Sequence, residues 1–165
     1  MIRMFMLPGG SRYVLFTQPV LDYMYSHAQR RWWQKEAGGE IFSRVPDSSG
    51  LIIDTVAGPN PNDRRSRHSW NPDCLAGDAD RLSQFQQGLH AVGLWHTHPE
   101  PVPQPSARDR ETTIDYLKAF NKERSRYLMV IIGNRGTPPT MSVWITLQER
   151  RGSWVQLQES AIPLQ

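Results

Sequence analysis

The chain has 165 residues, which is enough for one compact domain and too short for two domains of ordinary size. Its formal charge of +3 is far from the dense positive surface of a dedicated nucleic-acid binder, so nucleic acid is not the expected partner. A single cysteine, Cys74, excludes an intramolecular disulfide and argues against thiolate zinc ligands, which favours a reducing cytoplasm.

The N-terminal segment is apolar but short. Residues 1–7 end at Pro8-Gly9-Gly10 before the core of a signal peptide is complete, and no later apolar run approaches the length of a membrane span. We therefore expect a cytoplasmic protein with no membrane segment. The next residues, 12–16, are rich in aromatic and β-branched side chains and predict a strand.

A first helix is predicted over residues 19–34. Its apolar side chains recur at helical spacing, at Leu21, Met24, Tyr25, Ala28 and Trp32. Thr17 and Pro19 are typical of a helix start, and Gly38-Gly39 is typical of its end. Because tryptophan is more often buried than exposed, we expect Trp32, Trp33 and Trp95 to lie in the core.

The next segments predict a β-hairpin and a long loop. Residues 40–45 and 51–56 have strand character, and the turn-forming residues 46–50 lie between them. Residues 58–73 are rich in Pro, Asn, Asp and Arg and have no periodicity. They predict a long, basic, exposed loop, and a loop of this length is usually functional or mobile.

The second half predicts further helices and strands. Leu82, Phe85 and Leu89 indicate a second helix, and Ser106 begins a third, with apolar residues on one face. Strands are predicted over residues 91–95, 127–132, 141–147 and 154–157. This order predicts an α/β fold in which residues 1–165 form one domain, with a mixed sheet flanked by about three helices.

Three residues of types that bind metals lie within a short segment. His96 and His98 are two apart at the end of a predicted strand, so their imidazoles project to the same side. Asp109 lies one turn into the following helix and is able to reach the same point. Two imidazoles and one carboxylate are a usual set of ligands for catalytic zinc, which lowers the pKa of its bound water to about 7.

A catalytic zinc site also needs a group that takes up and returns protons. Glu36 and Glu40, at the junction of the first helix and the next strand, are the acidic candidates. We expect Glu40, which lies beyond the glycine pair, to point away from the metal and to form a salt bridge. Ser106 and Asp109 also have the spacing of a helix capping box, which is compatible with metal binding but does not explain the two histidines.

These residues resemble the JAMM signature of the JAB/MPN (Mov34/PAD-1) family of zinc metalloproteases. The first part is Glu36, two residues, Gly39 and Ile41-Phe42; the second is His96-Thr97-His98, seven residues, Ser106, two residues and Asp109. The resemblance covers roughly residues 12–145. Ser43 stands where the family often has a second glycine.

The resemblance implies a cytidine-deaminase-like mixed sheet and a zinc-dependent isopeptidase. It implies that His96, His98 and Asp109 bind zinc, that Glu36 is the general acid/base acting through the zinc water, and that Ser106 donates to the developing oxyanion. The expected substrate is the bond after the C-terminal tail of a ubiquitin-like modifier or conjugated protein. As a small single domain, the chain resembles bacterial members that accompany ubiquitin-like conjugation systems, including antiphage operons of the CBASS type.

The predicted loop also contains candidate substrate-binding residues: Arg64, Arg65, Arg67 and Trp70. Such a loop is able to hold an extended tail through main-chain hydrogen bonds, while its arginines attract an acidic partner. A solvated loop with no contact to substrate is the alternative. His27, His68 and His90 have no ligand spacing and are expected at the surface.

Two other functions remain open for this fold. One is a non-catalytic MPN scaffold, although the complete ligand set argues against it. The other is a nucleic-acid-associated protein of the RadC-like branch, which only the basic loop supports. A zinc nucleobase deaminase is excluded because it needs a pair of cysteines.

Overall fold

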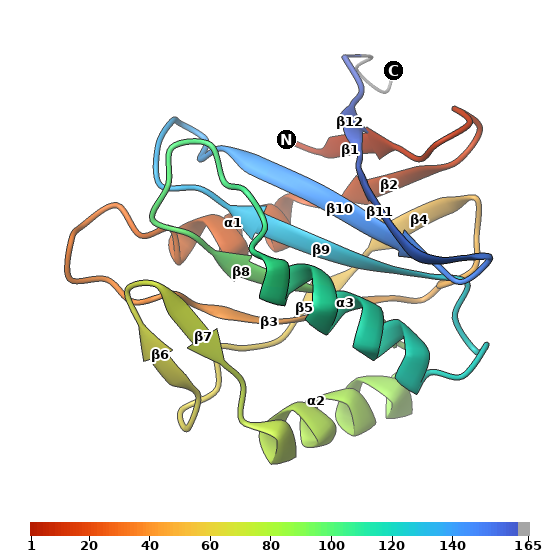
Figure 1. Ribbon diagram of the computed structural model, residues 1–165, viewed down its shortest axis with the longest axis horizontal. Helices are drawn as coiled ribbons and strands as arrows, with labels where there is room; N and C mark the ends of the chain where they lie inside the picture. The colour runs from red at the N-terminus through yellow and green to blue at the C-terminus, as the bar shows by residue number, and fades with distance from the viewer. Residues whose placement is uncertain (162–165) are drawn as a thin grey trace.

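The computed structural model describes residues 1–161, which form two mixed sheets, a separate β-hairpin and three helices (Figure 1). The larger sheet has the strand order β11 (Arg150–Gln156), β10 (Met141–Leu147), β9 (Arg126–Ile132), β8 (His90–Thr97), β3 (Gly38–Ser43) and β5 (Thr55–Val56). The smaller sheet has the order β12 (Gln158–Glu159), β1 (Arg3–Met6), β2 (Tyr13–Phe16) and β4 (Gly50–Ile53). The hairpin is β6 (Arg64–Ser66) and β7 (Ser69–Asn71), and the helices are α1 (Gln18–Ser26), α2 (Cys74–Gln86) and α3 (Ala107–Ala119).

Both faces of the larger sheet are covered. On the central strand β9, Val130 packs in the core shared with α1 and the smaller sheet, whereas Met129 and Ile131 pack in the cluster beneath α3. Figure 1 shows α3 in front of the sheet and α1 behind it. A strand covered on both faces is apolar at nearly every position, which explains the continuous apolar run of residues 127–132 in β9. The expected α/β class, a mixed sheet flanked by helices, is confirmed.

The first helix is shorter than predicted. It ends at Ser26, so the prediction of a helix to residue 34 is wrong. Residues 27–37 instead form a projecting loop, in which the side chains of Trp32 and Trp33 are 76% and 58% exposed. Their expected place in the core is therefore wrong, whereas Trp95 is fully buried as predicted. A residue distant in sequence holds this loop in place, because Arg67 Nη1 donates to the carbonyls of Arg31 and Trp32.

The predicted hairpin between residues 40–45 and 51–56 is only partly correct. The second segment divides between the sheets: β4 pairs in parallel with β2, and only β5 pairs antiparallel with β3. Leu51 and Ile53 are fully buried in the core of the smaller sheet, and this burial favours the pairing with β2. The predicted loop 58–73 is also not entirely irregular, because it contains the hairpin of β6 and β7.

Other differences lie near the ends of the predicted elements. Strand β1 pairs with β2 and was not predicted. Helix α2 starts at Cys74, where Asp73 caps it by accepting from the Leu75 and Ala76 amides. Of the residues that indicated this helix, Leu89 is buried just beyond its end, whereas Leu82 and Phe85 are exposed on its surface. Across residues 1–161, we find no helix with the length and apolar character needed to cross a membrane.

Candidate metal centre

His96 on β8 and His98 just beyond the end of this strand project toward α3. Strand β8 lies between β3 and β9, with Gly38 and Ile131 as the pairing partners of His96. The chain then continues in extended form, because the His98 amide donates to the Ile132 carbonyl at 2.9 Å. Residues two apart on an extended chain share a face, and the His96 and His98 side chains therefore meet, with their Nε2 atoms 2.8 Å apart.

Asp109 completes the group from the first turn of α3. Ser106 caps this helix, since its Oγ accepts from the Asp109 amide at 3.1 Å while its own amide donates to Asp109 Oδ2 at 2.6 Å. The cap directs the carboxylate toward the histidines. Its Oδ1 lies 3.3 Å from His96 Nε2, and its Oδ2 lies 3.5 Å from His98 Nε2. Burial alone raises the pKa of Asp109, but interactions with His96 and Ser106 outweigh it and lower this pKa to about 2.

These donor atoms fit a zinc ion. Ligands at about 2.0–2.1 Å from a tetrahedral zinc are about 3.3–3.4 Å from one another; the distances from the two Asp109 oxygens to the histidines are close to this value, and the 2.8 Å between the two Nε2 atoms is shorter. Two Nε2 atoms that face each other at 2.8 Å cannot both carry a proton, so at least one presents a lone pair. Burial, together with repulsion from His96, lowers the pKa of His98 and favours the neutral form that binds metals. Two nitrogens and one carboxylate suit zinc.

Glu36 lies at the edge of this cleft, just before β3. Its backbone is held by the hairpin: the Glu36 amide donates to the Ser66 carbonyl at 2.8 Å, and Arg65 Nε donates to the Glu36 carbonyl. Its side chain is buried and lines the same cleft as His96, His98 and Asp109. Burial raises the pKa of Glu36 to about 7 despite the attraction of His96, so the carboxyl is able to exchange protons near neutral pH.

Glu40 takes the role expected for it, although not the expected direction. It forms a salt bridge with Arg81 of α2, with 2.5 Å between Glu40 Oε1 and Arg81 Nη1. Because Glu40 pairs with Leu94, two residues before His96, it lies on the same face of the sheet as the histidines. The Trp70 ring packs over Gly38, where an added Cβ would lie 2.7 Å from it, and Glu40 lines the pocket beside α2 whereas Glu36 lines the metal cleft. Burial raises the pKa of Glu40 to about 7 as well, so position and not acidity distinguishes it from Glu36.

His96, His98 and Asp109 form the candidate metal group, and the cleft around them, the metal cleft, has a volume of about 550 Å³. Its walls include α3 and the hairpin, and the Trp70 ring stacks on His96 with the ring centres 6.2 Å apart. The indole is fixed in this position because Nε1 donates to Asp63 at 2.9 Å. Ser106 also lines the cleft and is exposed, so its hydroxyl is accessible to a bound substrate.

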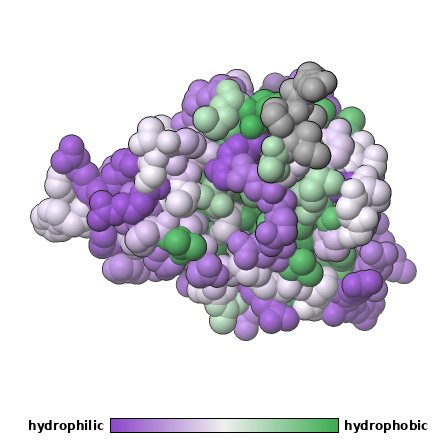
Figure 2. All heavy atoms as spheres, turned by 90° about the horizontal axis from the view of Figure 1, so that it is seen from above, coloured by the Kyte–Doolittle hydropathy of each residue, from purple (hydrophilic) through white to green (hydrophobic). Residues whose placement is uncertain are grey.

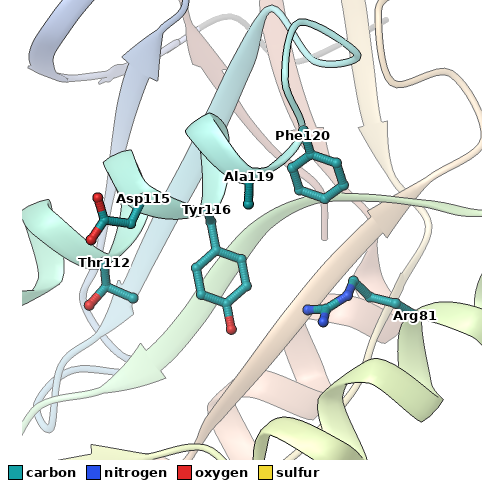
Figure 3. Close-up of a pocket in the computed structure, with 6 residues that line it drawn as sticks. All are labelled: Arg81, Thr112, Asp115, Tyr116, Ala119 and Phe120. Atoms are coloured by element: carbon teal, nitrogen blue, oxygen red, sulfur yellow. The ribbon is translucent and has the colours of Figure 1, made fainter.

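A second cavity of about 550 Å³ lies between α2 and α3 (Figure 3). Arg81 from α2 and Tyr116 from α3 point into it, and Phe120 closes one end. Thr112 and Tyr116 line both this cavity and the metal cleft, so the two spaces adjoin.

The arginines of the hairpin segment have different surroundings. Arg65 donates to the Glu36 carbonyl, and Arg67 donates to carbonyls of the 27–37 loop, so both are engaged with the main chain. Arg64 is exposed on β6. Figure 2 shows a mostly hydrophilic surface at the end of the molecule where the 27–37 loop projects in Figure 1. Of the remaining histidines, His68 is exposed as expected, whereas His27 is half-buried against Tyr23 and Trp95.

The sequence comparison assigns the family. The model of the family described as prokaryotic homologs of the JAB domain matches residues 17–146. The chain belongs to this JAB family. The match includes the metal group and Glu36, and it confirms the resemblance inferred from the two motifs.

Two curated relatives of this JAB protein carry the name CD-NTase/cGAS isopeptidase. The relative from Pseudomonas aeruginosa (strain BWHPSA011 / Pa011) is 29% identical over 121 residues, covering 72% of this chain and 75% of the relative. The relative from Escherichia coli (strain TW11681) is 24% identical over 136 residues, covering 81% and 80%.

Solved structures of similar fold include two solution structures of bacterial proteins. Protein DSY2949 from Desulfitobacterium hafniense has a TM-score of 0.62 at 19% identity, with 91% of each chain covered. A protein from Salinibacter ruber (strain DSM 13855) has a TM-score of 0.53 at 20% identity, with 86% of each chain covered. At this level of identity, the similarity supports the fold of the JAB protein and not a particular activity.

Three residues near the cleft were not predicted from the sequence. Gln29 is fully buried and bonds to Thr97, which lies between the two histidines. Tyr116 and Thr112 of α3 line the cleft. A polar residue just after a helix has no local pattern that marks it as buried, so no sequence signal identified Gln29. The spacing of Thr112 and Tyr116 from Asp109 in a helix could have indicated that they share its face.

Proposed function

We propose that this JAB protein is a zinc-dependent isopeptidase that hydrolyses the bond linking the C-terminal tail of a ubiquitin-like modifier, or of a CD-NTase, to another protein. The observation that carries the proposal is the convergence of His96, His98, Asp109 and Glu36 on one open cleft. The names of the two curated relatives support the substrate class and a place in a CBASS-type antiviral system. We also propose that residues 1–165 act as one domain, of which residues 162–165 lie outside the described part.

The roles of the side chains follow from their positions. Zinc, when held by His96, His98 and Asp109, supplies Lewis-acid activation of water and of the scissile carbonyl. Glu36 accepts a proton from the water that attacks the carbonyl carbon. The C–O bond forms, the C–N bond breaks, and Glu36 returns the proton to the leaving amine. Its pKa of about 7 suits both directions of transfer.

Ser106 is proposed to donate a hydrogen bond from its hydroxyl to the developing oxyanion. Its Oγ accepts from the Asp109 amide, which leaves the O–H free to donate. Ser106→Ala is expected to lower kcat by about 10² to 10³ because one oxyanion donor is lost. Loss of the helix cap is also expected to lower the free energy of unfolding by about 1 kcal/mol. Steady-state kinetics and urea unfolding measure the two effects, and a change confined to stability would leave Ser106 as a cap alone.

The hairpin is proposed to hold the substrate tail. Main-chain groups of β6 or β7 are able to pair with an extended tail, and Trp70 forms a wall of the cleft beside His96. Among the candidate arginines, Arg64 has an exposed side chain that is able to attract an acidic partner. Arg65 and Arg67 are proposed to assist binding indirectly, by fixing the hairpin against the loop that precedes Glu36.

The two alternatives have less support. A scaffold has no need for a complete ligand set beside a buried glutamate. A nucleic-acid-associated role depended on the basic segment, but the Arg65 and Arg67 guanidinium groups are already bonded to backbone carbonyls. Binding of DNA that falls steeply with salt would favour that alternative.

The proposal is tested with a conjugate in which a CD-NTase tail is isopeptide-linked to a lysine of a reporter protein. The zinc-loaded protein is expected to release the reporter, and mass spectrometry should locate the cut after the last residue of the tail. The same reporter linked to a scrambled tail is the matched control. No cleavage of the first conjugate, or equal cleavage of both, would contradict the proposed substrate class.

A further inference from the structure

Gln29 is a buried polar residue close to the site but outside the cleft. It follows α1 and the turn at His27, and its side chain is fully buried. A carboxamide without hydrogen-bond partners is costly to bury, so each of its polar atoms needs a partner. The partners that Gln29 has come from three segments that are far apart in the sequence.

The Gln29 carboxamide joins these segments directly. Its Oε1 accepts from Thr97 Oγ1 at 3.0 Å, at the end of β8. Its Nε2 donates to the Gln34 carbonyl at 3.1 Å and to the Arg67 carbonyl at 2.8 Å. One side chain thus connects the metal-binding strand, the 27–37 loop and the β6–β7 hairpin.

Thr97 extends the connection to the residue after Glu36. The Ala37 amide donates to Thr97 Oγ1 at 3.0 Å, and the Thr97 amide donates to the Ala37 carbonyl at 2.9 Å. Because Thr97 lies between the two histidines, this pair of bonds sets the separation between the Glu36 segment and the metal group. With its proton donated to Gln29, the Thr97 hydroxyl presents a lone pair to the Ala37 amide.

The hairpin holds Glu36 from the other side. The Ser66 carbonyl of the hairpin accepts from the Glu36 amide, and Arg65 Nε donates to the Glu36 carbonyl. The next residue, Arg67, gives its carbonyl to Gln29. Glu36 is therefore bonded to the hairpin and its neighbour Ala37 to the end of β8, and Gln29 is bonded to both of these segments.

We propose that Gln29 is a positioning residue, which fixes Glu36 relative to His96, His98 and Asp109 through Thr97 and the hairpin. The inference rests on the proposed function, because it assigns Glu36 the proton transfer. Gln29 is buried and acts through its partners, not on substrate. Glutamine fits these partners and glutamate does not, since an ionised glutamate would place a second acceptor against the Gln34 and Arg67 carbonyls.

The test is Gln29→Met, which keeps the length of the side chain and removes its donor and acceptor atoms. With the isopeptide-linked conjugate as substrate, kcat is expected to fall about 10- to 100-fold, because a small displacement of an acid/base group has a large effect on rate. KM and the zinc content of the purified protein are expected to stay within about 3-fold. Thr97→Val should lower kcat by a similar factor, whereas Thr97→Ser keeps the hydroxyl and should keep the wild-type kcat. The double variant Gln29→Met/Thr97→Val should have a kcat no lower than that of either single variant.

Arg126→Met is the matched control for a lost buried interaction. Arg126 bonds to the carbonyls of Pro46 and Ser48 and begins β9, whose other end lies beside His96. It should lower the midpoint of urea unfolding without changing kcat. If Gln29→Met does not fold, Thr97→Val carries the same test.

Hydrogen exchange in the absence of substrate separates this inference from the proposed function. In Gln29→Met, the Glu36 and Ala37 amides should exchange faster while the β9 amides stay protected. That result supports the positioning role even if the wild-type protein fails to cleave the conjugate. Unchanged exchange at both amides, or a Gln29→Met variant with wild-type kcat, would overturn it.

Discussion

Replacement of Glu36 by glutamine is expected to lower kcat by about 10² to 10⁴ while one zinc ion stays bound per chain. Glutamine has nearly the same size, so the backbone bonds of residue 36 to the hairpin remain. It cannot take a proton from water or return one to the leaving amine, and this alone accounts for the loss. Rates with the isopeptide-linked conjugate and metal analysis of the same sample are the two measurements.

Glu40→Gln is the matched control for this prediction. Glu40 has a similarly raised pKa and a similar depth of burial, but its partner is Arg81 and it lines the pocket beside α2, whereas Glu36 lines the metal cleft. The change should affect stability more than kcat, because it weakens a buried ion pair. A larger fall in kcat for Glu40→Gln than for Glu36→Gln would reverse the assignment of the general acid/base.

The grouping of the proposed metal ligands was predictable from sequence because their geometry is local. Alternation along an extended chain brings His96 and His98 to one side, and the capping box of Ser106 and Asp109 fixes the first turn of α3. Spacing alone therefore describes most of the group. Only the approach of α3 to β8 depends on packing of the larger sheet.

The segment that precedes Glu36 was not predictable in the same way. The apolar spacing of residues 21–32 favoured a long helix, yet the chain leaves the helix at His27, whose ring packs against Trp95. Within residues 27–37, the Gln29 side chain and the Trp32 carbonyl bond to Arg67, which belongs to a hairpin thirty or more residues away. Contacts of this kind override local propensity, and they have no signature in the local sequence.

The division of residues 51–56 between two sheets has a similar cause. Both halves have the same strand character, and side chains from both pack in the core shared by the two sheets. Leu51 and Ile53 are fully buried with the smaller sheet, whereas Thr55 and Val56 are half-buried at the edge of the larger one. Pairing with β2 and with β3 therefore follows from three-dimensional packing, which a turn at residues 46–50 does not determine.

The combined change of His96 and His98 to alanine is expected to abolish both zinc binding and hydrolysis. Asp109 is then the remaining member of the group, and a single carboxylate does not retain zinc. Zinc should fall from one ion per chain to background by elemental analysis. The rate with the conjugate should fall by at least about 10⁴-fold, because both activation of water and polarisation of the carbonyl are lost.

The matched control is His90→Ala, at the other end of β8, where the ring packs against Phe85 and not against the metal group. It should keep both zinc and activity. Removal of zinc from the wild-type protein by a chelator should reproduce the loss seen in the double variant, and added zinc should restore the rate in the wild type alone. Full activity in a metal-free wild-type protein, or an unchanged zinc content in the double variant, would show that these histidines do not form the catalytic metal site. The capping box and the buried histidine pair would then have only a structural role, in joining α3 to the end of β8.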